Sequence, residues 1–171
     1  GTQTPDQFVA NARLNGQALA AQVRRLVAAG ASHIAVTGTY DLGKTPWATA
    51  IGQEALLRQA SSRFNESLLV AINDLSQHVL YVDAAYYVIL YESTPSSFSF
   101  NNATTPVCTS VDAGNGIGIG QGQVNSALCT SATLLPDADA DRYVFADAVY
   151  LTPSAHRQLG TYAYDKLRAR W

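Results

Sequence analysis

The segment His33-Ile34-Ala35-Val36-Thr37 decides the fold class, because its composition predicts a short strand between two long helical patterns. Its β-branched residues and near absence of charge are typical of a strand buried on both faces. A second segment of this kind, Val79-Leu80-Tyr81-Val82, is ended by Asp83. Strands of this type that alternate with helices predict an α/β fold with parallel strands.

Helical patterns lie on both sides of the first strand. Thr4, Pro5 and Gln7 form the N-terminal capping pattern of a helix that Gly30 ends. Further helices are predicted at about 47–75, 84–91 (helix or turn) and 153–168. Besides the two core strands, only a short third candidate occurs near Phe145. Parallel sheets usually have about five or six strands. We therefore expect either an incomplete chain or a sheet completed by another chain.

The composition excludes several classes of protein. The 171 residues are 47% hydrophobic and 14% charged, with a net charge of -2, which argues against a disordered chain. The absence of a basic surplus argues against nucleic-acid partners. Because no apolar run approaches the ~20 residues of a membrane-spanning helix, we expect no membrane insertion by this chain. The sequence contains no methionine, so we expect a processed chain, a trimmed chain or a fragment.

No cofactor or metal is expected. The three histidines are scattered (His33, His78 and His156), and no zinc-binding spacing is present. The alternating glycines from Gly114 to Gly122 match no phosphate-binding loop. The acidic cluster at Asp137, Asp139 and Asp141 lacks the glycine and glutamate of a calcium loop, so a solvated turn is the simpler interpretation.

The two cysteines, Cys108 and Cys129, lie in an irregular region over residues 93–141 that is rich in Pro, Ser, Thr, Asn and Gly. A pair in such a loop predicts a disulfide, and with it a secreted or periplasmic protein. The alternative is two unpaired thiols in a cytosolic protein. A disulfide closing this loop would stabilise the fold by ~3 kcal/mol.

The segment Tyr143 to His156 is the most informative for function. It contains Asp147-Ala148-Val149-Tyr150, followed by Leu151-Thr152-Pro153. This stretch resembles the last block of the GDSL/SGNH esterases and lipases, in which an Asp-x-x-His pair precedes a Thr-Pro helix start. The resemblance implies that Asp147 stands at the position of the triad acid and that Tyr150 stands at the position of the triad histidine.

Within that family the chain is most similar to the passenger domains of bacterial autotransporter esterases. The matching stretches, which together cover nearly the whole chain, are Leu26 to Gly30, Asp41 to Pro46, Phe64-Asn65, Phe100 to Pro106 with the cysteines that follow, and Gly160 to Tyr164. The resemblance implies a bacterial protein that is secreted or exposed at the cell surface or outer membrane.

The resemblance also implies a fold. It predicts the C-terminal part of a flavodoxin-like (SGNH hydrolase) three-layer α/β/α sandwich with an incomplete parallel sheet. Residues 1–171 would form a single partial domain, because the family's Gly-Asp-Ser nucleophile block and Gly-x-Asn-Asp oxyanion block are absent from the sequence. The open edge at His33 to Thr37 would then recruit a second copy of the chain or a missing N-terminal half.

The departures from the family pattern decide the predicted activity. A triad needs an imidazole base, and a tyrosine, with an ordinary pKa near 10, is a poor substitute. His156 is the alternative base, or it has only a helix-surface or packing role. Asp147 also has a structural interpretation, in which it caps the loop before the final helix. We expect the C-terminal portion of a secreted carboxylic-ester hydrolase, inactive as this chain, with an ester or lipid substrate only in the full-length protein. The alternative is a degenerate, non-catalytic SGNH-like surface or interaction module.

Overall fold

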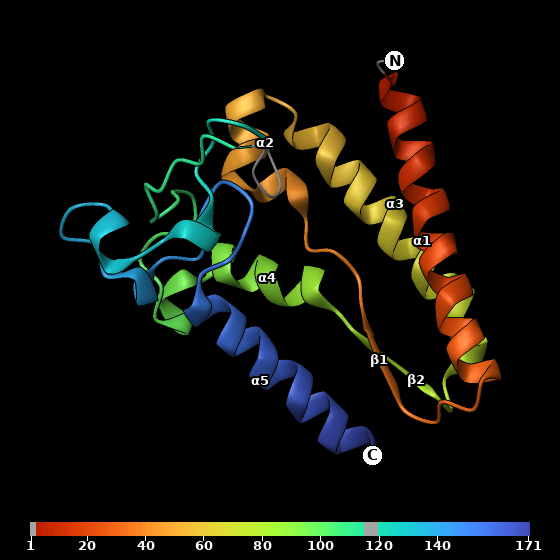
Figure 1. Ribbon diagram of the computed structural model, residues 1–171. Helices are drawn as coiled ribbons and strands as arrows, with labels where there is room; N and C mark the ends of the chain where they lie inside the picture. Colours follow the sequence, from red (N-terminus) through yellow and green to blue (C-terminus); the bar gives the residue numbers. More distant parts are fainter. Residues whose placement is uncertain (1–2, 115–119) are drawn as a thin grey trace.

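The computed structural model describes residues 3–114 and 120–171, and it places helices around one small parallel sheet (Figure 1). Strand β1 (Ile34–Thr37) pairs in parallel with β2 (Val79–Val82), with Ile34 opposite Val79. The predicted α/β class with parallel strands is confirmed. The third candidate strand is wrong: Tyr143 and Phe145 form only isolated bridges, to Asn102 and Leu151. The chain turns back directly after Phe145, which leaves no room for a ladder.

Helices α1 (Pro5–Ala28) and α3 (Glu54–Ile72) lie side by side on one side of the strands (Figure 1). The predicted capping box of Thr4 and Gln7 is confirmed at the start of α1. Gly16 is buried where the two helices meet, and a Cβ at this position would overlap Ser67 Oγ and the carbonyl oxygen of Phe64. The close contact between the two helices completes a hydrophobic core, whose buried members are Ala20, Val23, Val36, Leu68, Ile72 and Val79.

The single helix predicted over 47–75 is wrong. Helix α2 (Pro46–Ile51) ends at Gly52, whose φ of 62° is in the left-handed region, and α3 begins two residues later at Glu54. Glycine adopts this conformation without the steric cost that a Cβ imposes, so Gly52 ends α2 and redirects the chain. The break lets α2 lie apart from α3, at the end of the molecule that holds the irregular region (Figure 1).

The exit of β1 is held by Asn65 on α3. Its amide donates to the carbonyl oxygen of Thr39 over 2.7 Å and accepts from the Thr39 N–H over 2.9 Å. The preceding Gly38 has no room for a Cβ, which would overlap the Asn65 side chain and the Tyr81 hydroxyl. These contacts fix the direction in which the chain leaves the strand toward Tyr40.

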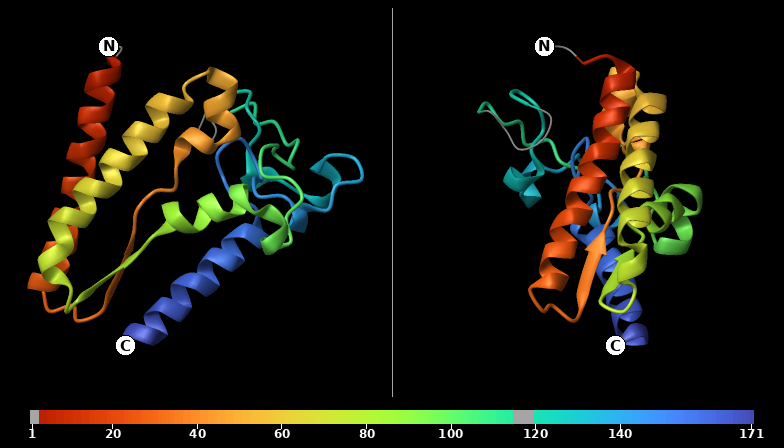
Figure 2. Two further views of the ribbon diagram at one scale, coloured as in Figure 1. Left: turned by 180° about the vertical axis from the view of Figure 1, so that it is seen from behind. Right: turned by 90° about the vertical axis from the view of Figure 1, so that its right-hand side faces the viewer.

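Helices α4 (Ala84–Ser93) and α5 (Pro153–Arg170) build a second core. Seen from both faces, α5 runs on the opposite side of the strands from α1 and α3 (Figure 2). The buried members of this core are Val88, Tyr91, Phe100, Val144, Phe145, Leu151 and Ala155. Val144 and Phe145 lie three and two residues before Asp147, so their burial fixes where that carboxylate lies.

The described part of residues 94–141 consists of short 3₁₀ turns and isolated bridges joined by irregular chain. Gly116 and Gly118 of the glycine run lie outside the described residues. At the acidic cluster, Asp139 caps a 3₁₀ turn by accepting the N–H of Asp141 over 3.1 Å. No helix of residues 3–114 and 120–171 is both long and apolar enough to cross a bilayer.

Candidate functional site

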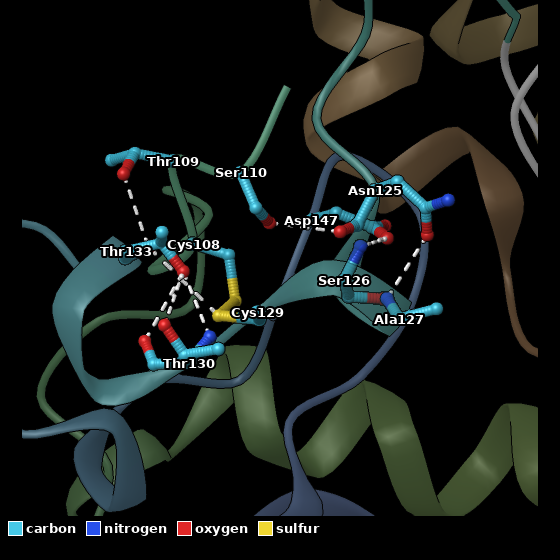
Figure 3. The surroundings of a disulfide bond; sticks show 10 residues. All are labelled: Cys108, Thr109, Ser110, Asn125, Ser126, Ala127, Cys129, Thr130, Thr133 and Asp147. Atoms are coloured by element: carbon cyan, nitrogen blue, oxygen red, sulfur yellow. Dashed lines mark hydrogen bonds between the residues drawn. A yellow bond between two sulfur atoms is a disulfide. The ribbon is translucent and has the colours of Figure 1, made fainter. Parts of the chain in front are cut away.

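Asp147 lies in a tight turn directly after the buried segment Val144 to Ala146. Its side chain is almost fully enclosed, with 3% of the residue exposed. Oδ1 accepts the backbone N–H groups of Val149 (2.9 Å) and Tyr150 (2.7 Å), and Oδ2 accepts the N–H of Ser126 (3.0 Å). Figure 3 shows the contact with Ser126. Three backbone donors thus hold one buried carboxylate in a single orientation.

The turn from Asp147 to Tyr150 is also held from outside, by the chain that follows β1. The Tyr40 hydroxyl donates to the carbonyl oxygen of Val149. The N–H of Trp47, at the start of α2, donates to the carbonyl oxygen of Ala148 over 2.8 Å. These two contacts bridge about a hundred residues of sequence. The turn at Asp147 is therefore fixed by contacts from Tyr40, Trp47 and Ser126.

Tyr40 is a neutral donor in this arrangement. Burial raises the pKa of the Tyr40 hydroxyl well above its ordinary value, and the nearby carboxylate of Asp147 raises it further. A protonated hydroxyl can donate to the Val149 carbonyl, whereas a phenolate would repel both that oxygen and the carboxylate. Tyr40 therefore reaches the Val149 carbonyl oxygen as a neutral phenol.

A cleft of about 700 Å³ opens beside this turn. Tyr150 and His156 both line it, together with both cysteines. Tyr150 has 39% of its surface exposed, and His156 is exposed on the first turn of α5. The described residues that line the cleft include no Asp, Glu, Lys or Arg. The cleft is thus suited to a neutral ligand with an apolar part.

The structure brings the three predicted site residues to one region without connecting them as a triad. Within residues 3–114 and 120–171, no hydrogen bond joins the carboxylate of Asp147 to the side chain of Tyr150 or to His156. The same part of the chain contains no group of three or more His, Cys, Asp or Glu side chains that could hold a metal ion. What the geometry provides is a buried, oriented carboxylate at Asp147, held next to Ser126, Ala146 and Tyr150, which line the cleft.

The predicted disulfide between Cys108 and Cys129 is confirmed (Figure 3). The Cys108 N–H donates to the carbonyl oxygen of Ala146 over 2.9 Å, directly before Asp147. Cys129 lies three residues after Ser126, and its N–H donates to the Ser126 carbonyl oxygen over 3.1 Å. The bond therefore ties together the two segments that flank the carboxylate.

Replacing both cysteines by serine should lower the free energy of unfolding by about 2–4 kcal/mol, because the denatured chain gains freedom when a closed loop is opened. Urea denaturation followed by circular dichroism measures this change. Amide exchange of Ser126 should accelerate more than that of residues in α1, since Ser126 loses its tether, whereas the buried residues of α1 pack against α3 and the strands. Unchanged exchange at Ser126 would contradict the role assigned to the disulfide.

A family model described as GDSL-like lipase/acylhydrolase matches residues 1–163. The chain belongs to this family. This membership agrees with the resemblance found in the segment Tyr143 to His156, at the end of the matched range.

Two relatives match this GDSL-like chain over most of its length. It is 27% identical over 162 residues to a Pseudomonas putida protein described as an uncharacterized protein in the trpE–trpG intergenic region, a match over 95% of this chain and 26% of the relative. It is 24% identical over 155 residues to a GDSL esterase/lipase of Arabidopsis thaliana, a match over 86% of this chain and 39% of the relative. The chain thus spans well under half the length of either relative.

Sequence reasoning on the GDSL-like pattern missed three residues that hold the turn at Asp147. Tyr40, Trp47 and Ser126 reach the turn through one hydroxyl and two backbone N–H groups. Backbone donors leave no signature in residue type. Only Tyr40 carries a signal, as a tyrosine in the loop that follows strand β1, a place where parallel α/β folds gather functional side chains.

Proposed function

We propose that these residues form the C-terminal portion of a secreted GDSL-type carboxylic-ester hydrolase, and that this chain does not hydrolyse esters. The observation that carries the proposal is the buried, three-fold hydrogen-bonded carboxylate of Asp147, with Tyr150 three residues later at the rim of the cleft. Asp147 would occupy the place of the triad acid. Such an acid orients an imidazole and stabilises its charged form, and Tyr150 presents no imidazole.

Three features support a partial domain within that family. The relatives are much longer than the match, the sheet formed by the described residues has two strands, and the sequence has neither a Gly-Asp-Ser nor a Gly-x-Asn-Asp block. The disulfide supports an oxidising location outside the cytoplasm, such as that of an autotransporter passenger domain at the bacterial surface. Tyr150 supports the second candidate function, a degenerate surface or interaction module that keeps the fold without the chemistry.

The chain and its Tyr150→His variant should both release p-nitrophenol from p-nitrophenyl butyrate no faster than a buffer blank. An added imidazole has no nucleophilic serine to activate in these residues. The assay runs beside Asp147→Asn and His156→Gln. If the chain hydrolyses the ester faster than the blank and either variant loses this activity, the proposal is overturned. Loss in Asp147→Asn would assign the acid role to Asp147, and loss in His156→Gln would assign the base role to His156.

The outer edge of β1 should mediate association. The Ile34 N–H donates to the carbonyl oxygen of His78 on the β2 side, so Ala35 and Thr37 turn their N–H and C=O groups outward. Unpaired edges of this kind recruit further strands, from a second copy or from the remaining part of a longer protein. Sedimentation of the isolated chain should show dimers or larger species.

Ala35→Pro removes one outward N–H and should shift the population toward monomer, whereas Val70→Ser, at an exposed position on α3, should not. A monomer at every loading concentration would count against the edge as an interface between copies.

A further inference from the structure

Helix α4 is apolar on all sides. Residues 84–91 read Ala-Ala-Tyr-Tyr-Val-Ile-Leu-Tyr, and the first charged residue of the helix is Glu92. Helices of this composition are normally enclosed on all sides. Here Val88 and Tyr91 enter the core, but Tyr86 is 56% exposed and Ile89 is 42% exposed. One face of α4 therefore has the composition of a covered surface and lies open.

This open face lines a groove of about 450 Å³ between α3 and α4. Tyr86 and Ile89 contribute from α4, Leu69 from α3, and Tyr81 and Asp83 from the end of β2. Leu69 is itself 47% exposed. Burial, and then the charge of Asp83, raises the pKa of Tyr81 to about 12. The exposed surface of the groove is thus mainly apolar, and it is also lined by the carboxylates of Asp41, Glu66 and Asp83 and by Arg58.

The charges around the groove are paired except at Asp83. Arg58 contacts Asp41 over 3.2 Å, and Arg63 contacts Glu66 over 2.8 Å. Asp83 accepts the Tyr86 N–H at Oδ1 over 2.9 Å. Over the described ranges, its other oxygen accepts no hydrogen bond and the residue forms no ion pair. One carboxylate oxygen is therefore available beside an exposed aromatic ring and two exposed aliphatic side chains.

We propose that this groove binds an arginine side chain of a partner polypeptide. Arginine combines an apolar stem with a planar cation. Its stem would pack on Leu69 and Ile89, and its guanidinium would reach Asp83 and the face of Tyr86, where a cation is attracted by the ring. The negative charge at Asp83 and the net charge of -2 oppose docking on an anionic lipid surface. The charge pattern thus favours a basic peptide over a membrane.

The test uses a fluorescein-labelled peptide of alternating arginine and leucine, with a second peptide in which citrulline replaces each arginine. Citrulline keeps the shape of arginine and removes its charge. Fluorescence anisotropy with the whole chain should show binding of the arginine peptide about tenfold tighter than that of the citrulline peptide, the effect of one to two charge-assisted contacts. Equal affinity for the two peptides would overturn the proposal.

Two variants locate the binding. Asp83→Asn keeps an N-cap acceptor for α4 and removes the charge, so it should weaken binding about threefold to tenfold. Ile89→Ser removes part of the apolar wall and should also weaken binding. The matched controls are Asp139→Asn, at an exposed capping aspartate elsewhere, and Leu14→Ser, at a 59% exposed position on α1. Wild-type affinity in both groove variants, or a loss in the controls as large as theirs, would overturn the assignment.

Vesicles of phosphatidylcholine with phosphatidylserine test whether the groove binds a membrane surface instead. The chain should not co-sediment with them. If the chain does co-sediment with the vesicles and Ile89→Ser abolishes this binding, the groove binds a lipid surface and not a peptide. That result would overturn the proposal.

Discussion

The Asp147→Ala variant should lose about 3–5 kcal/mol of the free energy of unfolding, which is a large part of the stability of a domain of this size. The substitution leaves the N–H groups of Ser126, Val149 and Tyr150 without their shared acceptor. Hydrogen bonds to a charged group contribute roughly 1.5–3 kcal/mol each, and unpaired buried donors cost more than exposed ones. Urea denaturation followed by circular dichroism measures the loss.

Two companion variants separate this effect from the loss of an ordinary cap. Asp147→Asn keeps a carbonyl oxygen as an acceptor and should lose less than the alanine variant. Asp139→Ala removes an exposed aspartate that accepts a single N–H, and should cost about 1 kcal/mol or less. If Asp147→Ala costs no more than Asp139→Ala, the carboxylate does not hold the turn in the way described above.

The Gly16→Ala variant should lose about 2–3 kcal/mol, although alanine is the better helix former by about 1 kcal/mol. The new Cβ would overlap the Phe64 carbonyl oxygen and Ser67 Oγ on α3. The carbonyl belongs to the backbone of a regular helix, so it cannot rotate away and α1 must move outward. Thermal and urea denaturation should both show the loss.

Gly160→Ala is the matched control, because it makes the same change in a helix. Gly160 is exposed on α5, and a Cβ there meets nothing within 4 Å. This variant should gain up to about 1 kcal/mol from helix propensity alone. A gain in both variants would mean that α1 and α3 are not in close contact at Gly16.

The parts of the fold that depend on local sequence were predictable. The capping box at Thr4 and the start of α5 at Pro153 follow from side chains that satisfy nearby backbone groups. The two strands follow from their β-branched, uncharged composition. The break at Gly52 was missed because a glycine inside an apolar periodic pattern is compatible with a continuous helix, and only tertiary packing decides whether the chain turns there.

The candidate site was predictable only in part, and for a related reason. The position of Asp147 came from the resemblance of one segment, and the structure places Tyr150 and His156 beside the same cleft. Their surroundings come from distant segments: the Tyr40 hydroxyl and the Trp47 N–H lie about a hundred residues away in sequence. Such long-range contacts depend on how the helices pack, which no local pattern records.

The turn at Asp147 is held by backbone groups and by Tyr40, and none of these contacts involves the side chain at position 150. Either tyrosine codon becomes a histidine codon through a single base change. An ancestor or descendant of this protein could therefore exchange phenol for imidazole in one mutational step, with the supporting loop already in place.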